Sequence, residues 1–402
     1  MVASRAGSWC AATLRASARY PLQYRSLNTL SHSFPYPEKL AFAFDIDGVL
    51  KHGEHVLPGT RNVMSLLSGA DGRLPKPVPF LMITNGGGMT EADRIKALTR
   101  DLGVPVSKNQ LVQSHTPLQN YVERFRDKPV LVCGGTGDAA RRIAHSYGLE
   151  QAYLLQDIVA WKSSVWDRYQ LSEEEESFVK VCELSPLFIR PGIFVSSPGA
   201  KALGEGRGVD FSQLPLHAIF VIHDAGLDWA LATQIITELL CSDGGRMGTR
   251  RKRQFGVYDG RDLPVVLTNP DFIWGTDYPL PRFGMAAFRI GLNAVYKTAT
   301  GVDIRYVQFG KPFKATYEFA EDMLRRHLVD LGEARDKPLN VYMVGDNPES
   351  DILGANTHGW NSILLKTGVY ETGTPSHLPT RIADNVEEGV MWALQRELED
   401  TR

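Results

Sequence analysis

The chain has 402 residues, of which 43% are hydrophobic, and its formal net charge is −2 with a pI near 6.6. This balance excludes a strongly basic nucleic-acid-binding protein and a polybasic membrane-surface protein. The length allows more than one hydrophobic core, and no run of 18 apolar residues predicts a membrane span.

The first 37 residues differ in composition from the rest of the chain. Arg5, Arg15, Arg19 and Arg25 are spaced among small and apolar residues, and no acidic residue precedes Glu38. A basic, acid-free amphipathic segment is typical of a mitochondrial transit peptide, and an unstructured basic tail is the alternative. We therefore expect residues 1–37 to direct the chain to mitochondria, to the matrix, and to take no part in the fold.

The four cysteines are Cys10, Cys133, Cys182 and Cys241, and no two of them form a CxxC pair. Their spacing argues against a zinc ribbon and against a disulfide scaffold. A reducing compartment fits this pattern, with the cysteines acting as small hydrophobic residues.

From residue 39 onward, short β-rich runs alternate with helical stretches. The predicted strands are LAFAFD (40–45), PFLMITN (79–85), VLVCGG (130–135), HAIFVIHD (217–224), PVVLTNPD (264–271), YVQFGKP (306–312), VYMVGDN (341–347) and NSILLKTG (361–368). Several are continuously apolar, as strands buried on both faces of a parallel sheet are. Helical periodicity covers 225–240 and 314–328, and Thr116 before Pro117 predicts a helix start. The pattern predicts an α/β protein with a doubly wound parallel sheet.

Two stretches are predicted to be irregular. Residues 158–215 contain SEEEES and many glycines, and residues 241–256 contain five arginines and lysines between 246 and 253. Weak periodicity and frequent chain breakers are typical of loops. We interpret the basic stretch as a solvated surface insertion rather than as an anion site.

Polar residues follow the first two predicted strands. Asp45 and Asp47 end the first strand, and Gly48 permits a tight turn directly after them. Thr84 and Asn85 end the second strand and precede a glycine triplet, 86–88, whose N–H groups can face an anion. Ligands of open parallel sheets bind at the carboxyl ends of the strands, where all these groups are expected.

Two later strands end in the same way. Lys311 follows the strand at 306, and Asp346 and Asp351 follow the strand at 341. Carboxylates that cluster repel one another unless a divalent cation neutralises them, and oxygen-only ligands favour Mg²⁺. A cation, a lysine and a hydroxyl beside a carboxylate are the groups that hold a phosphoryl group and attack it. We therefore expect all four motifs at one edge of one sheet.

In this order, DIDGV, TNG, GKP and GDNPESD resemble the four signatures of the haloacid dehalogenase superfamily. The resemblance runs from residue 39 to about 395. It implies a Rossmann-like core interrupted by a large α/β cap of the pyridoxal-phosphatase-like class, class IIA. TNGGGMTEADRIKAL and SHTP resemble, more narrowly, the cat eye syndrome critical region protein 5 subgroup. The domains expected after the transit segment 1–37 are core 38–110, cap 111–272 and core 273–402.

The resemblance also implies roles for the acidic residues. Asp45 would be the nucleophile that forms an aspartyl-phosphate, and Asp47 the general acid and base. Asp45, Asp346 and the carbonyl group of Asp47 would bind Mg²⁺. Asp351 would act from the second shell of the metal, through water or by orienting the lysine.

Other residues are implied to hold the substrate. Thr84 and the amide of Asn85 would bind the phosphoryl oxygens, and Lys311 would offset their charge. Asn269 and Asp271, in LTNPD, are candidate substrate contacts, although a turn that closes the strand would also explain them. Two departures from the family are Gly86, a candidate phosphate-binding position where many relatives carry a second asparagine, and a cap enlarged by residues 158–215.

The presence of Asp47 favours a phosphatase or phosphomutase over a dehalogenase, and a large cap favours a small substrate. We expect hydrolysis of a small phosphomonoester, with a phosphorylated glycerol derivative of mitochondrial glycerophospholipid metabolism as the first candidate. The expected partner is that metabolite and no nucleic acid, and a homo-oligomer is left open. The alternative is a catalytically silent binding or scaffold protein that keeps the fold.

A competing pattern lies in VLVCGGTGDAARRIA. Gly135, Gly137 and Ala140 match the G-x-G-x-x-A dinucleotide fingerprint, and Asp157 stands 20 residues after Gly137. The pattern falls within the predicted cap, where a strand followed by a helix needs a glycine turn in any case. We therefore favour a structural turn over a nucleotide site. Similarly, we interpret His223 as a packed core residue rather than a ligand.

Overall fold

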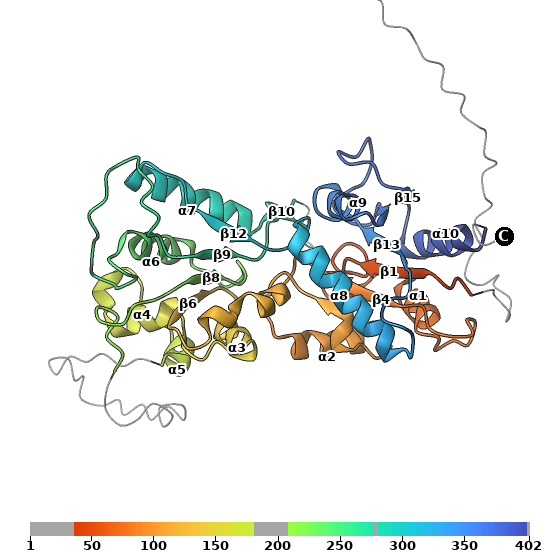
Figure 1. Ribbon diagram of the computed structural model, residues 1–402, viewed down its shortest axis with the longest axis horizontal. Helices are drawn as coiled ribbons and strands as arrows, with labels where there is room; N and C mark the ends of the chain where they lie inside the picture. Colours follow the sequence, from red (N-terminus) through yellow and green to blue (C-terminus); the bar gives the residue numbers. More distant parts are fainter. Residues whose placement is uncertain (1–35, 181–207, 276–277, 279, 400–402) are drawn as a thin grey trace, which may run out of the picture.

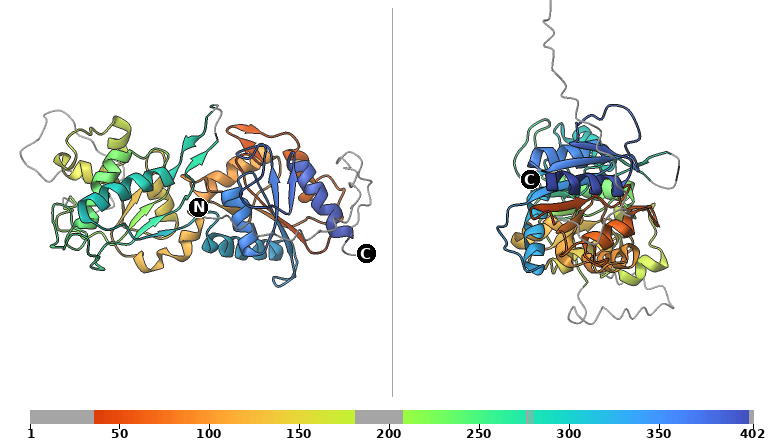
Figure 2. Two further views of the ribbon diagram at one scale, coloured as in Figure 1. Left: turned by 90° about the horizontal axis from the view of Figure 1, so that it is seen from above. Right: turned by 90° about the vertical axis from the view of Figure 1, so that its right-hand side faces the viewer.

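The computed structural model describes residues 36–180, 208–275, 278 and 280–399. Two lobes lie side by side along the longest axis, and each is built on its own parallel sheet (Figures 1 and 2). Almost all of the predicted transit segment lies outside the described residues. Among the helices that are described, none is both long and apolar enough to cross a bilayer.

The first lobe, the core domain, holds a six-stranded parallel sheet with strand order β15-β14-β13-β1-β4-β5. Its strands are β1 (Leu40–Phe44), β4 (Phe80–Ile83), β5 (Leu111–Val112), β13 (Asn340–Gly345), β14 (Asn361–Leu365) and β15 (Arg381–Ala383). A short hairpin, β2 (Lys51–His52) and β3 (His55–Val56), follows β1. Every residue of β1 is buried, as its unbroken apolar run predicts for a central strand.

Helices cover both faces of this sheet. Phe42 and Phe44 of β1 pack in one apolar cluster with residues of α1 (Thr60–Leu67), α2 (Glu91–Leu102) and α10 (Val386–Glu399). Ala41 and Ala43 point the other way and pack with α8 (Lys314–Asp330) and α9 (Leu353–His358). The neighbouring strands add Leu81, Ile83 and Met343 to this second face. The doubly wound α/β architecture is therefore confirmed.

The second lobe, the inserted domain, holds a five-stranded parallel sheet with strand order β12-β9-β8-β6-β7. Its strands are β6 (Val130–Cys133), β7 (Ala152–Tyr153), β8 (Ile219–Val221), β9 (Val265–Leu267) and β12 (Tyr306–Gln308). Its helices are α3 (Ala139–Ser146), α4 (Leu155–Trp161), α5 (Glu173–Phe178), α6 (Trp229–Cys241) and α7 (Met285–Thr300). An antiparallel hairpin, β10 (Ile273–Trp274) and β11 (Arg282–Phe283), leads into α7.

Strand pairing divides the chain differently from the boundaries 111–272 expected for the cap. β5, at Leu111–Val112, pairs with β4 in the core sheet. β12 pairs with β9, so residues 306–308 belong to the sheet of the inserted domain. Phe288 and Leu292 of α7 lie in the apolar cluster that α6 also joins. Motif spacing could not reveal this, because the strand at 306 looks the same whichever sheet it joins.

The predicted helix start at Thr116 is wrong in type. The chain there forms two 3₁₀ helices, Thr116–Asn120 and Val122–Phe125, and His115 is the N-cap residue. The Thr116 hydroxyl accepts the N–H of Gln113 at 2.9 Å and donates to Glu91 at 2.8 Å. Its hydroxyl is therefore used by neighbouring loops and does not cap an α-helix.

Both stretches predicted to be irregular contain ordered structure. Within 158–215, the SEEEES run forms α5, because Ser172 Oγ accepts the N–H of Glu175 at 3.2 Å in a capping box. Residues 181–207 of that stretch lie outside the described residues. The basic stretch is not wholly solvated, since Arg251 is 7% exposed and pairs with Asp259 and Asp262.

Candidate active site

Three of the four motifs meet at the carboxyl edge of the core sheet. Asp45 follows β1, Thr84 follows β4 and Asp346 follows β13, and these three strands are adjacent and parallel. The expectation that Lys311 follows a strand of the same sheet is wrong, because it follows β12 of the inserted domain. Lys311 reaches the core site from the segment that returns to α8.

Three buried carboxylates form the centre of the site. Asp45, Asp346 and Asp351 each offer an oxygen, and these oxygens lie within 4.8 Å of one another. The three residues are 8%, 3% and 0% exposed. Such a cluster is costly without cations, because burial disfavours each charge and the charges repel one another.

Lys311 is the cation within this cluster. Its Nζ lies 2.8 Å from Asp45 Oδ1 and 2.7 Å from Asp351 Oδ1, and the residue is 1% exposed. Burial opposes its charge, but Asp351 and Asp45 outweigh burial and raise the pKa of Lys311. The lysine therefore stays protonated and offsets one of the three negative charges.

Lys311 leaves the other two carboxylate charges of this cluster without a positive partner. Burial, and then the nearby Asp351, raise the pKa of Asp346 to about 7. Burial, with Asp351 and Asp346, also raises the pKa of Asp45 well above its usual range, although Lys311 opposes this. A hard divalent cation held by these oxygens would remove the deficit, and the all-carboxylate donor set fits Mg²⁺.

Backbone groups hold two of these carboxylates in place. Asp346 Oδ2 accepts the N–H of Val369 at 2.7 Å. Asp351, in the π-helical turn Pro348–Ile352, accepts the N–H groups of Asp346 at 3.1 Å and Asn347 at 3.0 Å through Oδ2. Its other oxygen is directed to Lys311, which agrees with the predicted role of orienting the lysine.

Asp47 differs from the clustered carboxylates. Its side chain is 51% exposed, and Arg94 Nη2 lies 3.9 Å from its Oδ2. Gly48 follows with φ at 81°, the left-handed turn that turns the chain away after Asp47. The Asp47 carboxyl is thus two residues from the buried Asp45 but open to an incoming molecule, as a general acid must be.

The loop after β4 presents Thr84 to the site and ties it to the returning segment. Gly86 N donates to Thr84 Oγ1 at 2.9 Å, which leaves the hydroxyl proton to donate elsewhere. The Asn85 side chain donates to Asp271 Oδ1 at 2.9 Å and to the Lys311 carbonyl at 3.0 Å. It also accepts the Lys311 N–H at 2.6 Å. Asn85 therefore fixes the backbone that carries the lysine.

The predicted substrate contacts Asn269 and Asp271 lie beside Asn85, whose side chain donates to Asp271. Asn269 Oδ1 accepts the N–H of Asp271 at 2.8 Å, which is the turn that the sequence offered as the alternative. Burial raises the pKa of Asp271 to about 6, while Lys311 and the hydrogen bond from Asn85 oppose this. Substrate contact by either residue stays a prediction.

Two histidines lie near the glycine triplet: His223, interpreted from the sequence as a packed core residue, and His115, not singled out as a site residue. His223, after β8, lies over the glycine triplet: a Cβ on Gly87 would be 3.2 Å from its Cδ2, and one on Gly88 would be 3.3 Å from its Cγ. It therefore packs at the domain junction and not in a core. His115 Nδ1 lies 2.7 Å from the Tyr147 hydroxyl, which donates to Glu91. The glycine triplet allows this approach, and three adjacent glycines are the one sequence signal for it.

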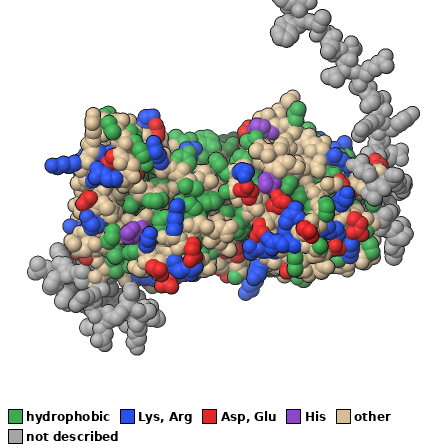
Figure 3. All heavy atoms as spheres, viewed as in Figure 1, with side chains coloured by type: hydrophobic (Ala, Val, Ile, Leu, Met, Phe, Trp, Pro, Cys, Tyr) green, Lys and Arg blue, Asp and Glu red, His purple; other side chains and the backbone are tan. Residues whose placement is uncertain are grey.

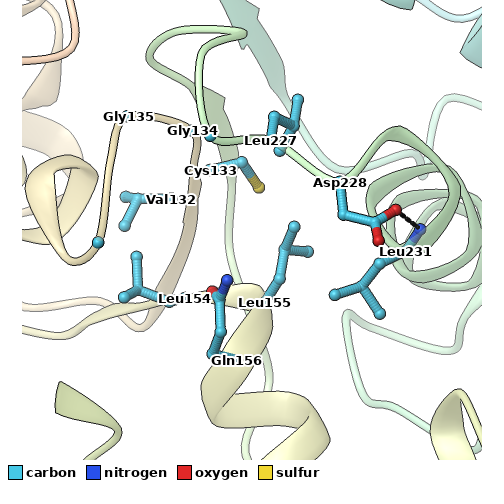
Figure 4. Close-up of a pocket in the computed structure, with 12 residues that line it drawn as sticks. Val132, Cys133, Gly134, Gly135, Leu154, Leu155, Gln156, Leu227, Asp228 and Leu231 are labelled. Carbon is cyan, nitrogen blue, oxygen red and sulfur yellow. Dashed lines mark hydrogen bonds between the residues drawn. The ribbon is translucent and has the colours of Figure 1, made fainter. Parts of the chain in front are cut away.

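Among the described residues, the dinucleotide pattern is accounted for by packing and by an ion pair. Asp157 is fully buried, where it pairs with Arg141 and accepts the Leu154 N–H at 2.7 Å. The cavity beside the glycines measures about 10 Å³, room for one water molecule. Figure 4 shows leucine side chains of two segments closing around it. A Cβ on Gly135, the first glycine of the pattern, would lie 2.9 Å from the Ala139 Cβ, so close packing explains this glycine.

Comparison with known proteins agrees with this geometry. The family model of haloacid dehalogenase-like hydrolases matches residues 42–150, and a second hydrolase-like model of that group matches residues 308–389. A mitochondrial hydrolase of Saccharomyces cerevisiae is 32% identical over 379 residues, which cover 89% of this chain and 96% of the yeast protein. A cardiolipin synthase/mitochondrial hydrolase fusion protein of Schizosaccharomyces pombe is 33% identical over 93% of this chain, and the match spans 56% of the fusion.

Solved structures share the fold at low sequence identity. The p-nitrophenyl phosphatase of Archaeoglobus fulgidus superposes with a TM-score of 0.53 and 15% identity, covering 89% of this chain and all of that one. A glycerol phosphate phosphatase of Mycobacterium tuberculosis, solved with magnesium, superposes with a TM-score of 0.50 and 16% identity, covering 89% of this chain and 78% of that one. With the four motifs, the carboxylate cluster and a yeast relative matched almost end to end, this chain belongs to the haloacid dehalogenase-like hydrolases.

Proposed function

We propose that the protein is a Mg²⁺-dependent phosphohydrolase that acts on a small phosphomonoester through an aspartyl-phosphate on Asp45. One observation carries the proposal: the buried Asp45 lies against Lys311 and two further carboxylates, while Asp47, two residues later, stays open to solvent. A buried nucleophile beside a fixed cation, with an accessible acid two residues away, is the arrangement that two-step phosphoryl transfer requires.

The chemistry follows from these positions. A carboxylate oxygen of Asp45 bonds to phosphorus while the bond from phosphorus to the leaving oxygen breaks, and Asp47 gives that oxygen a proton. Asp47 then takes a proton from water, whose oxygen attacks the phosphorus and releases phosphate from Asp45. Asp45, Asp346 and the Asp47 carbonyl would hold Mg²⁺, which when bound offsets negative charge on the phosphoryl oxygens.

The remaining groups bind the phosphoryl group. The Thr84 hydroxyl, whose oxygen already accepts the Gly86 N–H, donates a hydrogen bond to a phosphoryl oxygen. The backbone amide of Asn85 is a second donor, and Lys311 attracts the phosphoryl charge. Asp351 keeps the ammonium group of Lys311 aimed at Asp45.

Mitochondrial lipid metabolism is the proposed setting. The basic, acid-free segment 1–37 supports import into mitochondria, and the names of the two relatives described above both include a mitochondrial hydrolase. One of them is fused to a cardiolipin synthase, and one structural neighbour is a glycerol phosphate phosphatase. A phosphorylated glycerol derivative is therefore the first substrate to test, in the matrix.

The test is phosphate release by the purified chain from para-nitrophenyl phosphate and from a panel of glycerol phosphates. We expect turnover with Mg²⁺, none with a chelator, and none from Asp45→Asn. Asp384→Asn, which alters an exposed ion pair with Lys366, serves as the control and should keep full activity. If wild type releases no phosphate and Mg²⁺ does not raise its melting temperature, the scaffold alternative replaces this proposal.

Import is tested separately. Residues 1–37 fused to a fluorescent protein should direct it to mitochondria, and removal of these residues should leave the chain in the cytosol. Replacing Arg5, Arg15, Arg19 and Arg25 by glutamine should abolish import. A fusion that stays cytosolic would contradict the targeting prediction without affecting the proposed chemistry.

A further inference from the structure

Arg94 lies beside the proposed general acid. It belongs to the first turn of α2, which begins seven residues after Thr84, and its Nη2 lies 3.9 Å from Asp47 Oδ2. This is an ion pair without a hydrogen bond, and the arginine side chain is 24% exposed. Within the described parts of the chain, its buried Nε has no hydrogen-bond partner. A buried N–H of a cation without an acceptor is costly, and a bound anion would satisfy it.

Gly86 leaves the space in front of this guanidinium open. A Cβ at position 86 would lie 3.1 Å from Thr84 Oγ1, 3.5 Å from Asp47 Oδ2 and 4.0 Å from Arg94 Nη2. Position 86 is thus surrounded by the proposed phosphoryl-binding hydroxyl, the proposed acid and the arginine. A longer side chain there would stand between Arg94 and a substrate on Thr84.

His223 of the inserted domain lies against Gly87 and Gly88, the two residues that follow position 86. Its Nδ1 accepts the N–H of Ala225 at 3.0 Å, which places the proton of the neutral ring on Nε2. Burial first, and then Arg94, lower the pKa of His223, whereas Asp224 and Asp47 oppose this. The neutral ring therefore adds a hydrogen-bond donor near Arg94 and Asp47 without adding charge.

We propose that Arg94, with His223 nearby, binds a second anionic group of the substrate, so that the substrates are phosphomonoesters that also carry a carboxylate or a second phosphate. This inference rests on the proposed function. Asp47 must lie beside the leaving oxygen to protonate it, so the organic part bonded to that oxygen extends toward Arg94. A planar guanidinium with an unsatisfied N–H matches a carboxylate or phosphate better than a neutral hydroxyl.

The experiment uses the full chain and three substrates of one carbon length: propyl phosphate, 3-(phosphonooxy)propanoate and propane-1,3-diyl bisphosphate. They share the phosphoester and differ only at the far end. We expect wild type to show kcat/KM values at least tenfold higher for the two substrates with a second anion. Comparison of these two then distinguishes a carboxylate preference from a phosphate preference.

The variants separate binding of the second anion from other roles of Arg94. Arg94→Gln should lower kcat/KM for the charged substrates about 10- to 100-fold more than for propyl phosphate, the value of a charge-assisted hydrogen bond. Arg94→Lys should restore part of the loss. Arg100→Gln, an exposed arginine six residues further along α2, is the matched control and should change none of the three values.

Two results would overturn the inference. An equal loss on all three substrates would mean that Arg94 acts on Asp47 or on the phosphoryl group itself. Equal wild-type values for all three would mean that no second anion is recognised. If wild type hydrolyses none of them, the proposed function is judged on para-nitrophenyl phosphate and the glycerol phosphates, and calorimetric binding of the three propyl compounds decides the inference. Tighter binding of the charged compounds that Arg94→Gln abolishes supports it, and equal affinities refute it.

Discussion

Asp346 lies between two glycines that leave no room for a side chain. A Cβ on Gly368 would lie 1.9 Å from Asp346 Oδ2, and one on Gly48 would lie 2.3 Å from the same atom. Gly368→Ala should therefore displace this carboxylate and weaken Mg²⁺ binding, with at least a tenfold higher Mg²⁺ requirement in phosphate release. Gly291→Ala, in α7 with nothing within 4 Å, is the control. An unchanged Mg²⁺ requirement in Gly368→Ala would argue against Asp346 as a ligand.

Asp351 has a structural role in addition to its place near the proposed metal. It is fully buried, and its two oxygens serve Lys311 and two backbone N–H groups. Asp351→Asn removes one charge of a buried ion pair, so we expect a loss of about 3 kcal/mol in the free energy of unfolding, measured in urea. Asp384→Asn removes an exposed charge and should give no measurable loss. Equal stabilities of the two variants would refute this assignment.

At the scale of single residues, the sequence was sufficient to predict which side chains meet where a motif fixes a short turn at the end of a strand. Asp45, Asp346 and Asp351 come together as predicted, because adjacent parallel strands bring their ends to one edge. Arg94 and His223 could not be placed in this way. The position of Arg94 depends on how α2 is rotated about its axis. The position of His223 depends on how closely the inserted domain approaches the glycine triplet.

Among the helices, α8 carries a titratable group that couples stability to pH. His327 is 6% exposed and packs edge-on against Phe80, and burial lowers its pKa from 6.5 to about 4. The unfolded chain therefore binds a proton below about pH 6.5 that the folded chain does not bind until about pH 4. Stability from this group is complete above pH 6.5 and falls as the pH decreases, by about 3 kcal/mol once both states are protonated.

His327→Gln tests this coupling. Between pH 8 and pH 5, the free energy of unfolding measured in urea should decrease less for the variant than for wild type. His115, whose pKa burial also lowers to about 4, contributes to the same slope and should keep the variant from becoming pH-independent. The measurement at pH 8 is the internal reference. If variant and wild type lose the same free energy between the two pH values, His327 is not responsible.

At the scale of elements, the predicted strands were found because a continuous apolar run that is short and bounded by turn residues is typical of a buried strand. The errors concern local signals at the ends of helices. One such signal was overridden by tertiary contacts, and another was overlooked. Thr116 looked like a helix cap but bonds to Glu91 and Gln113. The acidic run after Ser172 looked irregular, although Ser172 and Glu175 satisfy each other as a capping box.

For the whole molecule, Asn85 is the hydrogen-bonded link between the core loop and the segment that returns from the inserted domain. Asn85→Ala removes three hydrogen bonds and leaves Asp271 without its donor. We expect at least a tenfold lower kcat, because the Lys311 backbone loses its support, and about 2 kcal/mol lower stability. Asn356→Ala, which loses one exposed and one partly buried hydrogen bond to residues other than Lys311 and Asp271, should keep the wild-type kcat. A normal kcat in Asn85→Ala would show that the lysine needs no such support.

The surface differs between the two domains. Figure 3 shows charged side chains gathered over the core domain and hydrophobic ones over the part of the inserted domain around β12. Tyr306 and Val307 of β12 are 39% and 38% exposed, although the strand is part of a sheet. A chain with alternating apolar runs does not reveal which strand will be the edge strand. This, and the sheet that the strand joins, could be learned only from the folded molecule.

The route of β12 has a consequence for how such proteins diverge. Since the strand that leads to Lys311 pairs with the sheet of the inserted domain, deleting that domain as a unit would also remove the approach of the lysine. A change that keeps β12 paired with β9 would preserve this approach of Lys311, whereas the gain or loss of a strand between them would alter it. The inserted domain can therefore vary elsewhere, but the pairing of β12 with β9 has to be kept if Lys311 is to reach the core site.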